Sequence, residues 1–235
     1  LVGSEMCIRD SCNAVIEHAK ATGDYGLESD INAPFVTANE NSKEIIFALP
    51  FDEIYVTDWN AFDFHLYTLA PENQATYGFT DRPWGGVCAI PQFIKSFDPD
   101  DKRLAEWYIQ GQQYDASGNI LLRSSDGNPL IYEVDVPSID ASDVDDGFRW
   151  GKFEYAHGIT NRLSNDFPLF RYADILMMKA EALMRDGKPG AGELVTMVRS
   201  RAFPNNPEKA VVTDEQLKGG SVYDYGRGDE YATSS

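Results

Sequence analysis

Apolar residues in the last third of the chain recur at the spacing of one helix face. In a first run, which ends at about Arg185, the residues that share this face are Phe170, Ala173, Leu176, Met177, Ala180, Leu183 and Met184. Polar residues interrupt the pattern over 185–190, and a second run follows from Ala191 to Ala202 before Phe203 and Pro204 end it. The period predicts two amphipathic helices, and the short break predicts that they form an antiparallel hairpin.

Shorter patterns lie near the start of the chain. From Cys12 to Ala21 the apolar residues again follow helical spacing, and Gly23 lies where a helix can end. The run from Glu44 to Phe51 is compact, apolar and rich in β-branched and aromatic residues, which favours a short buried strand. We therefore expect a helix and then a strand in this part of the chain.

The middle of the chain has no long apolar period. From Asp52 to Gly86, aromatic residues are scattered among Asp, Asn, Gly and Pro, which predicts long ordered loops, and such loops are uncommon without a function. Residues 89–97 predict a helix or turn, and residues 104–122 predict strands joined by a Gly-Asn turn. The Asp-rich residues 135–147 have little to bury, so we expect a surface loop there.

Charge and cysteine content limit the possible classes of function. The 235 residues include 38 acidic and 20 basic side chains, and the formal charge of −18 repels nucleic acid and anionic lipid headgroups. Three cysteines, Cys7, Cys12 and Cys88, form no CxxC pair and are too few for a disulfide framework. No apolar run approaches the roughly 18 residues that a membrane-spanning helix needs.

The sequence lacks recognisable catalytic motifs. Its three histidines are isolated, and it contains neither a GxSxG nucleophile motif nor a Gly-rich phosphate loop. Residues 98–103 lack the spacing of a calcium loop and are interpreted as a turn held by Asp-Arg ion pairs, and the acids of 140–146 as solvated side chains. We expect no cofactor, no metal site and no enzymatic activity. A glycoside hydrolase, suggested only by the abundant carboxylates, is the enzymatic alternative.

One long stretch resembles a known protein family. The sequence NDFPLFRYADILMMKAEALMRDG, from Asn165 to Gly187, is similar to the helix-entry motif of the SusD/RagB nutrient-uptake proteins. Three further stretches agree with the family in the same order, and they are VIEHAKATGDYGL (15–27), NSKEIIFALPFDE (41–53) and IPQFIKSFDPDDKRL (90–104). The resemblance covers nearly all of the chain from Cys12 to Ala202.

The most specific residues of this signature are Arg171, Tyr172 and Asp174. We interpret them as structural. Arg171 is expected to make a charge-assisted contact near the start of the helix, and Asp174 to favour the positive end of the helix dipole.

The resemblance implies a mainly α fold, with tetratricopeptide-type helix hairpins, α+β elements in insertions and long irregular loops. It also implies a surface-exposed lipoprotein of a Bacteroidetes-type outer membrane, attached only through a lipidated N-terminal cysteine that this sequence does not contain. The implied partner is a SusC-like TonB-dependent transporter, which would receive oligosaccharides or, for some members, peptides. No covalent chemistry is implied.

These patterns together suggest how the chain is organised. LVGSEMCIRDS (1–11) is similar to a translated sequencing adaptor and is expected to be non-native. The rest is expected to be a partial SusD-like domain lacking both ends. Its expected parts are a helix and strand in 12–50, a loop-rich ligand-binding insertion in 51–164, the helix hairpin in 165–203 and a truncated tail in 204–235.

Candidate ligand-binding residues lie in the predicted loops. Sugar recognition needs aromatic faces for the C–H side of a pyranose ring, and amide, carboxylate or guanidinium groups for its hydroxyls. The candidates are Trp59, Asn60, Tyr77, Asp81, Arg82 and Trp84, with Trp107 and Trp150 as second choices. The alternative is that these aromatic rings fill the interior of the loops. The sequence favours a non-catalytic glycan-capture protein, and a peptide-binding uptake protein and a structural adaptor remain alternatives.

Overall fold

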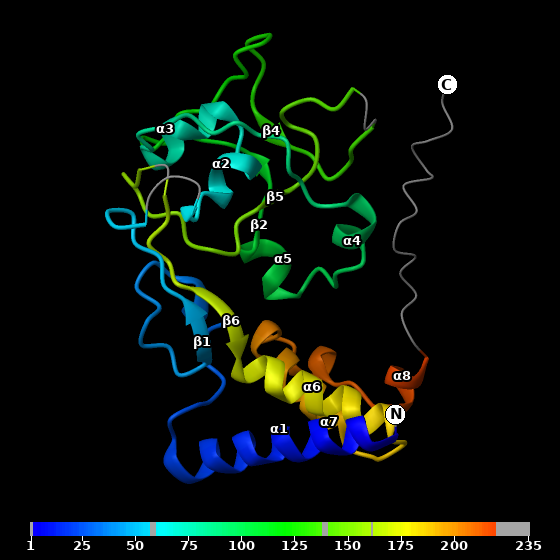
Figure 1. The fold of residues 1–235 in the computed structure, drawn as a ribbon. Coiled ribbons are helices and arrows are strands. Elements are labelled where there is room, and N and C mark those ends of the chain that lie inside the picture. Colours follow the sequence, from blue (N-terminus) through cyan, green and yellow to red (C-terminus); the bar gives the residue numbers. More distant parts are fainter. Residues whose placement is uncertain (1, 57–59, 138–140, 161, 220–235) are drawn as a thin grey trace. The chain divides into compact units, whose positions relative to one another are not determined.

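The computed structural model describes residues 2–56, 60–137, 141–160 and 162–219, with side chains from Glu5 onward. The chain forms two compact units (Figure 1). One combines residues 2–50 with the segment that begins at Asp166, and the other extends from Phe51 to Asn165. The first unit is mainly helical, whereas the second contains short helices and two-residue strands.

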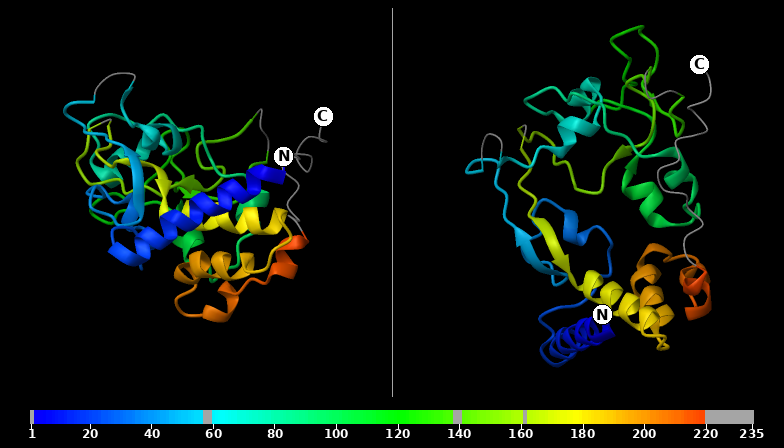
Figure 2. Two further views of the ribbon diagram at one scale, coloured as in Figure 1. Left: turned by 60° about the horizontal axis from the view of Figure 1, so that its bottom comes forward. Right: turned by 45° about the vertical axis from the view of Figure 1, so that its right-hand side comes forward.

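Three helices form most of the first unit. In Figures 1 and 2, α1 (Val2–Thr22) lies along α6 (Tyr172–Arg185), and α6 lies along α7 (Ala191–Arg199). Ile16 of α1 packs on Leu176 of α6 because apolar residues share one face of each helix. Since α1 begins at Val2, this helix includes adaptor-like residues as well as the predicted helix. The shorter elements are η1 (Ala33–Phe35), η4 (Ser200–Ala202), η5 (Pro207–Ala210) and α8 (Asp214–Lys218).

The predicted helix hairpin is present as α6 and α7, with a correction at its start. Phe170 was expected on the helix face, but it lies on strand β6 (Phe167–Arg171) with an exposed side chain. Strand β6 pairs antiparallel with β1 (Ile45–Leu49), which confirms the predicted strand, but the strand is not buried as expected, since Phe47 and Leu49 are exposed. This pairing keeps the backbone extended through Arg171, so the helix begins only at Tyr172.

Arg171 and Glu44 connect the strand pair to the helix. Arg171 donates a hydrogen bond from Nη1 to Oε1 of the fully buried Glu44, at 2.8 Å, and Arg201 donates to Oε2 of the same carboxylate. Asp174 accepts a hydrogen bond from the backbone N–H of Arg171, also at 2.8 Å, and so satisfies a donor at the helix start. These contacts confirm the structural interpretation of the signature.

The second unit is built from short elements. Its helices are α2 (Phe64–Thr68), η3 (Pro71–Asn73), α3 (Gln74–Tyr77), α4 (Pro91–Lys95) and α5 (Lys102–Glu106). Its antiparallel strand pairs are β2 (Tyr108–Ile109) with β5 (Arg149–Trp150), and β3 (Gly111–Gln112) with β4 (Ile131–Tyr132). The prediction of continuous loops over 52–86 was therefore wrong in part. The helices in this stretch were missed because a one-turn helix is too short to show a period of apolar residues. The expected Gly-Asn turn is confirmed, since Tyr114 and Ile120 pair across it.

A buried polar contact fixes the interior of the second unit. Leu130 and Tyr132 pack with Ala70 and Leu121 in its apolar core. The Tyr132 hydroxyl donates to Oδ1 of Asn73 and accepts the backbone N–H of Ala70 at 2.8 Å, so the polar end of this buried ring is satisfied. Among the described residues, no helix combines the length and apolarity needed to cross a membrane.

Candidate functional site

Two exposed aromatic rings meet at right angles on the surface of the second unit. The ring centroids of Tyr67 and Trp84 are 4.8 Å apart, and the ring planes are inclined by 88°. Tyr67 is 42% exposed and Trp84 is 58% exposed. This edge-to-face contact leaves aromatic surface of both residues open to solvent. We refer to Tyr67 and Trp84 as the aromatic corner.

Backbone hydrogen bonds hold the aromatic corner together. Trp84 N–H donates to the carbonyl of Leu66 at 2.7 Å, and Val87 N–H donates to the carbonyl of Tyr67 at 2.9 Å. The segment of Trp84 to Val87 therefore runs against the end of α2. Gly85 and Gly86 allow this path because both have positive φ angles, of 74° and 109°, which other residues rarely adopt.

Buried side chains support the corner from inside the unit. Thr68 donates from Oγ1 to the carbonyl of Val87 and accepts the backbone N–H of Trp150, both at 3.0 Å. Arg149 is buried and donates to the same Val87 carbonyl at 3.3 Å. The segment that carries Trp84 is thus fixed at both its α2 side and its β5 side.

Polar groups of opposite charge precede Trp84 in the sequence. Asp81 is exposed, and its carboxylate makes no hydrogen bond or ion pair with any residue that the structure describes. Arg82 donates to the hydroxyl of Ser124 at 3.4 Å, and the Ser124 N–H donates to Glu72 at 2.8 Å. Burial raises the pKa of Glu72, but the hydrogen bonds from Ser124 and the charge of Arg82 outweigh it, so this pKa lies below its ordinary value.

The structure separates the predicted site residues into groups. Asp81, Arg82 and Trp84 lie on one exposed segment, and Asn60 is also exposed, whereas Trp59 lies outside the described residues. Tyr77 instead packs inward, stacked on Phe79 with centroids 5.0 Å apart. Burial raises the pKa of Tyr77 to about 12.

Tyr67 is the residue that the sequence interpretation missed. It was one of many aromatic residues between Asp52 and Gly86, and only its exposed place on α2 distinguishes it. The two second choices are engaged in packing. Lys152 Nζ lies 4.6 Å from the centre of the Trp107 ring, and Trp150 contacts Phe64 with centroids 4.1 Å apart.

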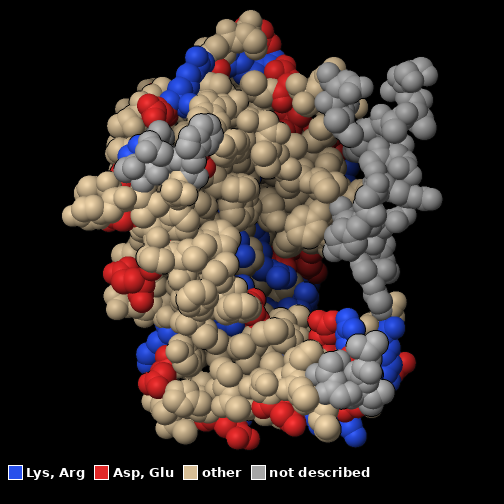
Figure 3. Space-filling view, viewed as in Figure 1, with Lys and Arg blue, Asp and Glu red and all other residues tan. Residues whose placement is uncertain are grey.

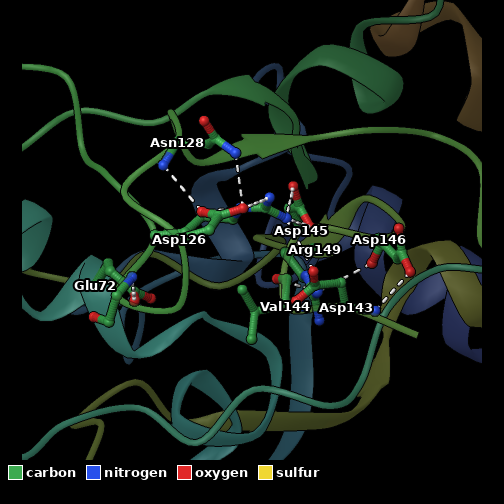
Figure 4. Close-up of polar contacts among 10 residues, drawn as sticks. Glu72, Asp126, Asn128, Asp143, Val144, Asp145, Asp146 and Arg149 are labelled. Atoms are coloured by element: carbon green, nitrogen blue, oxygen red, sulfur yellow. Dashed lines mark hydrogen bonds and ion pairs between the residues drawn. The ribbon is translucent and has the colours of Figure 1, made fainter. Parts of the chain in front are cut away.

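The acidic segments of this unit are held by arginines. Arg123 donates to Asp143 at 3.0 Å and to Asp145 at 2.9 Å, and it also contacts Asp126. The three acidic residues are labelled in Figure 4. The side chains of 140–146 were interpreted as solvated. Asp143 is exposed although it pairs with Arg123, whereas for Asp145 the interpretation is wrong, because its side chain is only 19% exposed beside Arg123. The predicted Asp-Arg turn is confirmed, since Asp101 accepts both the backbone N–H and the guanidinium of Arg103.

Comparison with known proteins extends this description. The family model of the SusD family matches residues 43–218. Similar solved structures include surface glycan-binding protein A from Bacteroides thetaiotaomicron in complex with laminarihexaose, at 18% identity and a TM-score of 0.62, covering 88% of this chain and 47% of that one. A SusD superfamily protein from Parabacteroides distasonis is similar at 20% identity and a TM-score of 0.58, and the match covers 84% of this chain and 39% of that one. NanU from Bacteroides fragilis is similar at 18% identity and a TM-score of 0.58, and the match covers 90% of this chain and 42% of that one. No curated protein matches the sequence.

These structures share the fold of the chain at low sequence identity. The chain spans less than half the length of each of the three. The shared fold is mostly helical with a few short strands, in agreement with the mainly α expectation. The family model covers both helices of the hairpin, the β1–β6 pair and the whole second unit. The chain therefore belongs to the SusD family.

Proposed function

We propose that this protein captures oligosaccharides at the cell surface without modifying them. The aromatic corner carries this proposal, because two adjoining rings that remain solvent-exposed in a well-fixed segment match the apolar C–H faces of sugars. One of the similar structures, surface glycan-binding protein A, is a complex with laminarihexaose, which supports a glycan as the ligand class.

The proposed roles follow from side-chain chemistry. Tyr67 and Trp84 stack on sugar rings, and Asp81 and Arg82 bind hydroxyl groups as acceptor and donor. Trp59 and Asn60 remain proposed ligand contacts. Tyr77 is proposed to support the loop, since Phe79 and Tyr155 pack against its ring.

For the whole protein, we propose the role implied by its family. It would be a surface lipoprotein of the outer membrane that delivers oligosaccharides to a SusC-like TonB-dependent transporter. Starch-like glycans are one candidate class. The family match supports this role. The partnership can be tested by measuring whether the transporter binds to this protein when it is immobilised.

Substitution of the corner tests the binding function. Trp84→Ala and Tyr67→Ala should each weaken oligosaccharide binding about tenfold, measured by calorimetry against a panel of oligosaccharides. Tyr114→Ala is the matched control, because Tyr114 is similarly exposed on the same unit and should leave affinity unchanged. Equal losses for all three variants would contradict the proposed site.

The same preparation tests the alternatives. Binding of peptides but not of any glycan would favour a peptide-uptake protein. Release of reducing ends from a polysaccharide by purified protein would show a hydrolase and contradict a non-catalytic role.

A further inference from the structure

We infer that the aromatic corner selects uncharged oligosaccharides over chains that carry uronate, sialate or sulfate groups. This inference rests on the proposed function and adds the substrate class to it. It begins with Asp81, whose exposed carboxylate has no partner among the described residues. Three residues of chain can span at most about 11 Å, so the Asp81 backbone lies within that distance of Trp84.

A free carboxylate affects neutral and anionic sugars in opposite ways. Its two oxygens accept hydrogen bonds from the neighbouring hydroxyls of a neutral pyranose. A second carboxylate or a sulfate on the sugar would instead repel Asp81, and the repulsion is felt at a separation comparable to the screening length of about 8 Å at physiological salt. The charge of Asp81 therefore distinguishes ligands that the aromatic rings alone would treat alike.

Three basic side chains of the second unit bear on an anionic ligand. Arg82, beside Asp81, is exposed and contacts Ser124, and its positive charge also acts on the carboxylate of Glu72. Arg149 reaches the Val87 carbonyl, but it is buried and also donates to the carbonyls of Val144 and Asp146, so a sugar cannot replace these partners without disrupting the loop. Lys95 pairs with Asp135 at 2.6 Å.

The surrounding charge acts in the same direction. Between Phe51 and Asn165 the sequence contains 19 acidic and 8 basic residues. In the view of Figure 3, acidic side chains are spread over the surface among a majority of uncharged ones. Such an excess lowers the local concentration of anionic ligands and leaves that of neutral ligands unchanged.

Matched pairs of ligands test the inference. Each neutral oligosaccharide of the panel is compared with its C6-oxidised, uronate-bearing form, by calorimetry with the full chain at low and high salt. The neutral member should bind about threefold to tenfold more tightly at low salt, and high salt should reduce this ratio. Asp81→Asn should also reduce the ratio. Glu133→Gln is the control, because it removes one exposed carboxylate of the same unit that has no described side-chain partner.

The outcomes separate this inference from the proposed function. If neutral and oxidised forms bind equally, or if the oxidised form binds more tightly and loses its advantage in Arg82→Met, the inference is wrong while glycan binding stands. If no oligosaccharide of either kind binds, both the inference and the proposed function are overturned.

Discussion

The carboxylate of Glu44 and the guanidinium of Arg171 are 127 positions apart in sequence and joined by a hydrogen bond of 2.8 Å in the first unit. Glu44 is fully buried, and Arg201 binds its second oxygen, so one acid directly before β1 is shared by two arginines. Since a buried charge is stable only when its partners are present, this contact links the strand pair to the helices that follow it.

Removal of either member of this pair should destabilise the protein strongly. Glu44→Gln leaves two arginines facing a neutral amide, and Arg171→Met leaves the carboxylate with one cationic partner, Arg201. Each should lower the free energy of unfolding by about 3–5 kcal/mol, measured by urea denaturation followed by circular dichroism. Arg185→Met is the control, because its ion pair with Glu181 is exposed and should contribute less than about 1 kcal/mol. Equal effects for buried and exposed pairs would refute this account.

Gly192 permits a close approach between the start of α7 and the segment before α8. A Cβ atom at this position would lie 2.5 Å from the carbonyl oxygen of Val212 and 2.9 Å from the backbone nitrogen of Asp214. Gly192→Ala must therefore move backbone, and we expect it to lower the free energy of unfolding by about 1–3 kcal/mol in thermal or urea denaturation. Gly26→Ala, where a Cβ would meet no atom within 4 Å, should have little effect. A stable Gly192→Ala variant would show that the contact is easily relieved.

His65 should make the stability of the protein depend on pH. Its side chain is fully buried beside Phe79 and Tyr155, and neither ring nitrogen has a hydrogen bond of normal geometry within the described residues. Burial lowers the pKa of His65 to about 4, and the backbone of Thr160 opposes this shift only in part. The unfolded chain, with a histidine pKa near 6.5, therefore binds more protons than the folded chain as pH falls from about 6.5 to about 4.

The sign of this effect makes acid destabilising. Between pH 7 and pH 5 the His65 contribution should reduce the free energy of unfolding by about 2 kcal/mol. His65→Leu should remove this part of the pH dependence in urea denaturation at the two pH values. If His65→Leu and the parent lose the same stability on acidification, His65 is not the responsible group.

Gly86 should control how Trp84 is presented. Its φ of 109° is a conformation that an L-residue with a Cβ rarely adopts, so alanine there must alter the path of the segment from Trp84 to Val87. We expect Gly86→Ala to weaken oligosaccharide binding severalfold while the global unfolding midpoint changes little. Gly26→Ala again provides the control. Unchanged affinity would show that the corner tolerates a different backbone path.

The sequence by itself determined the long helices, the β1 strand and the family. The repeat of apolar residues predicted α6 and α7 because a helix buries one face, and that periodicity is written along the chain. It also placed Trp84, Asp81 and Arg82 in a loop, because aromatic residues among Pro, Gly and Asp do not fit a continuous helix or strand.

Only the tertiary structure decided which aromatic rings face solvent. Tyr67 and Tyr77 belong to the same aromatic-rich stretch, yet Tyr67 meets Trp84 at the surface and Tyr77 stacks inward on Phe79. Hydrogen bonds between the end of α2 and the segment from Trp84 to Val87 bring Tyr67 against Trp84, and such contacts leave no periodic trace in the sequence. The two arginine partners of Glu44 also could not be predicted from the sequence. Strand pairing and helix packing bring them to the carboxylate, and no local sequence pattern indicates these contacts.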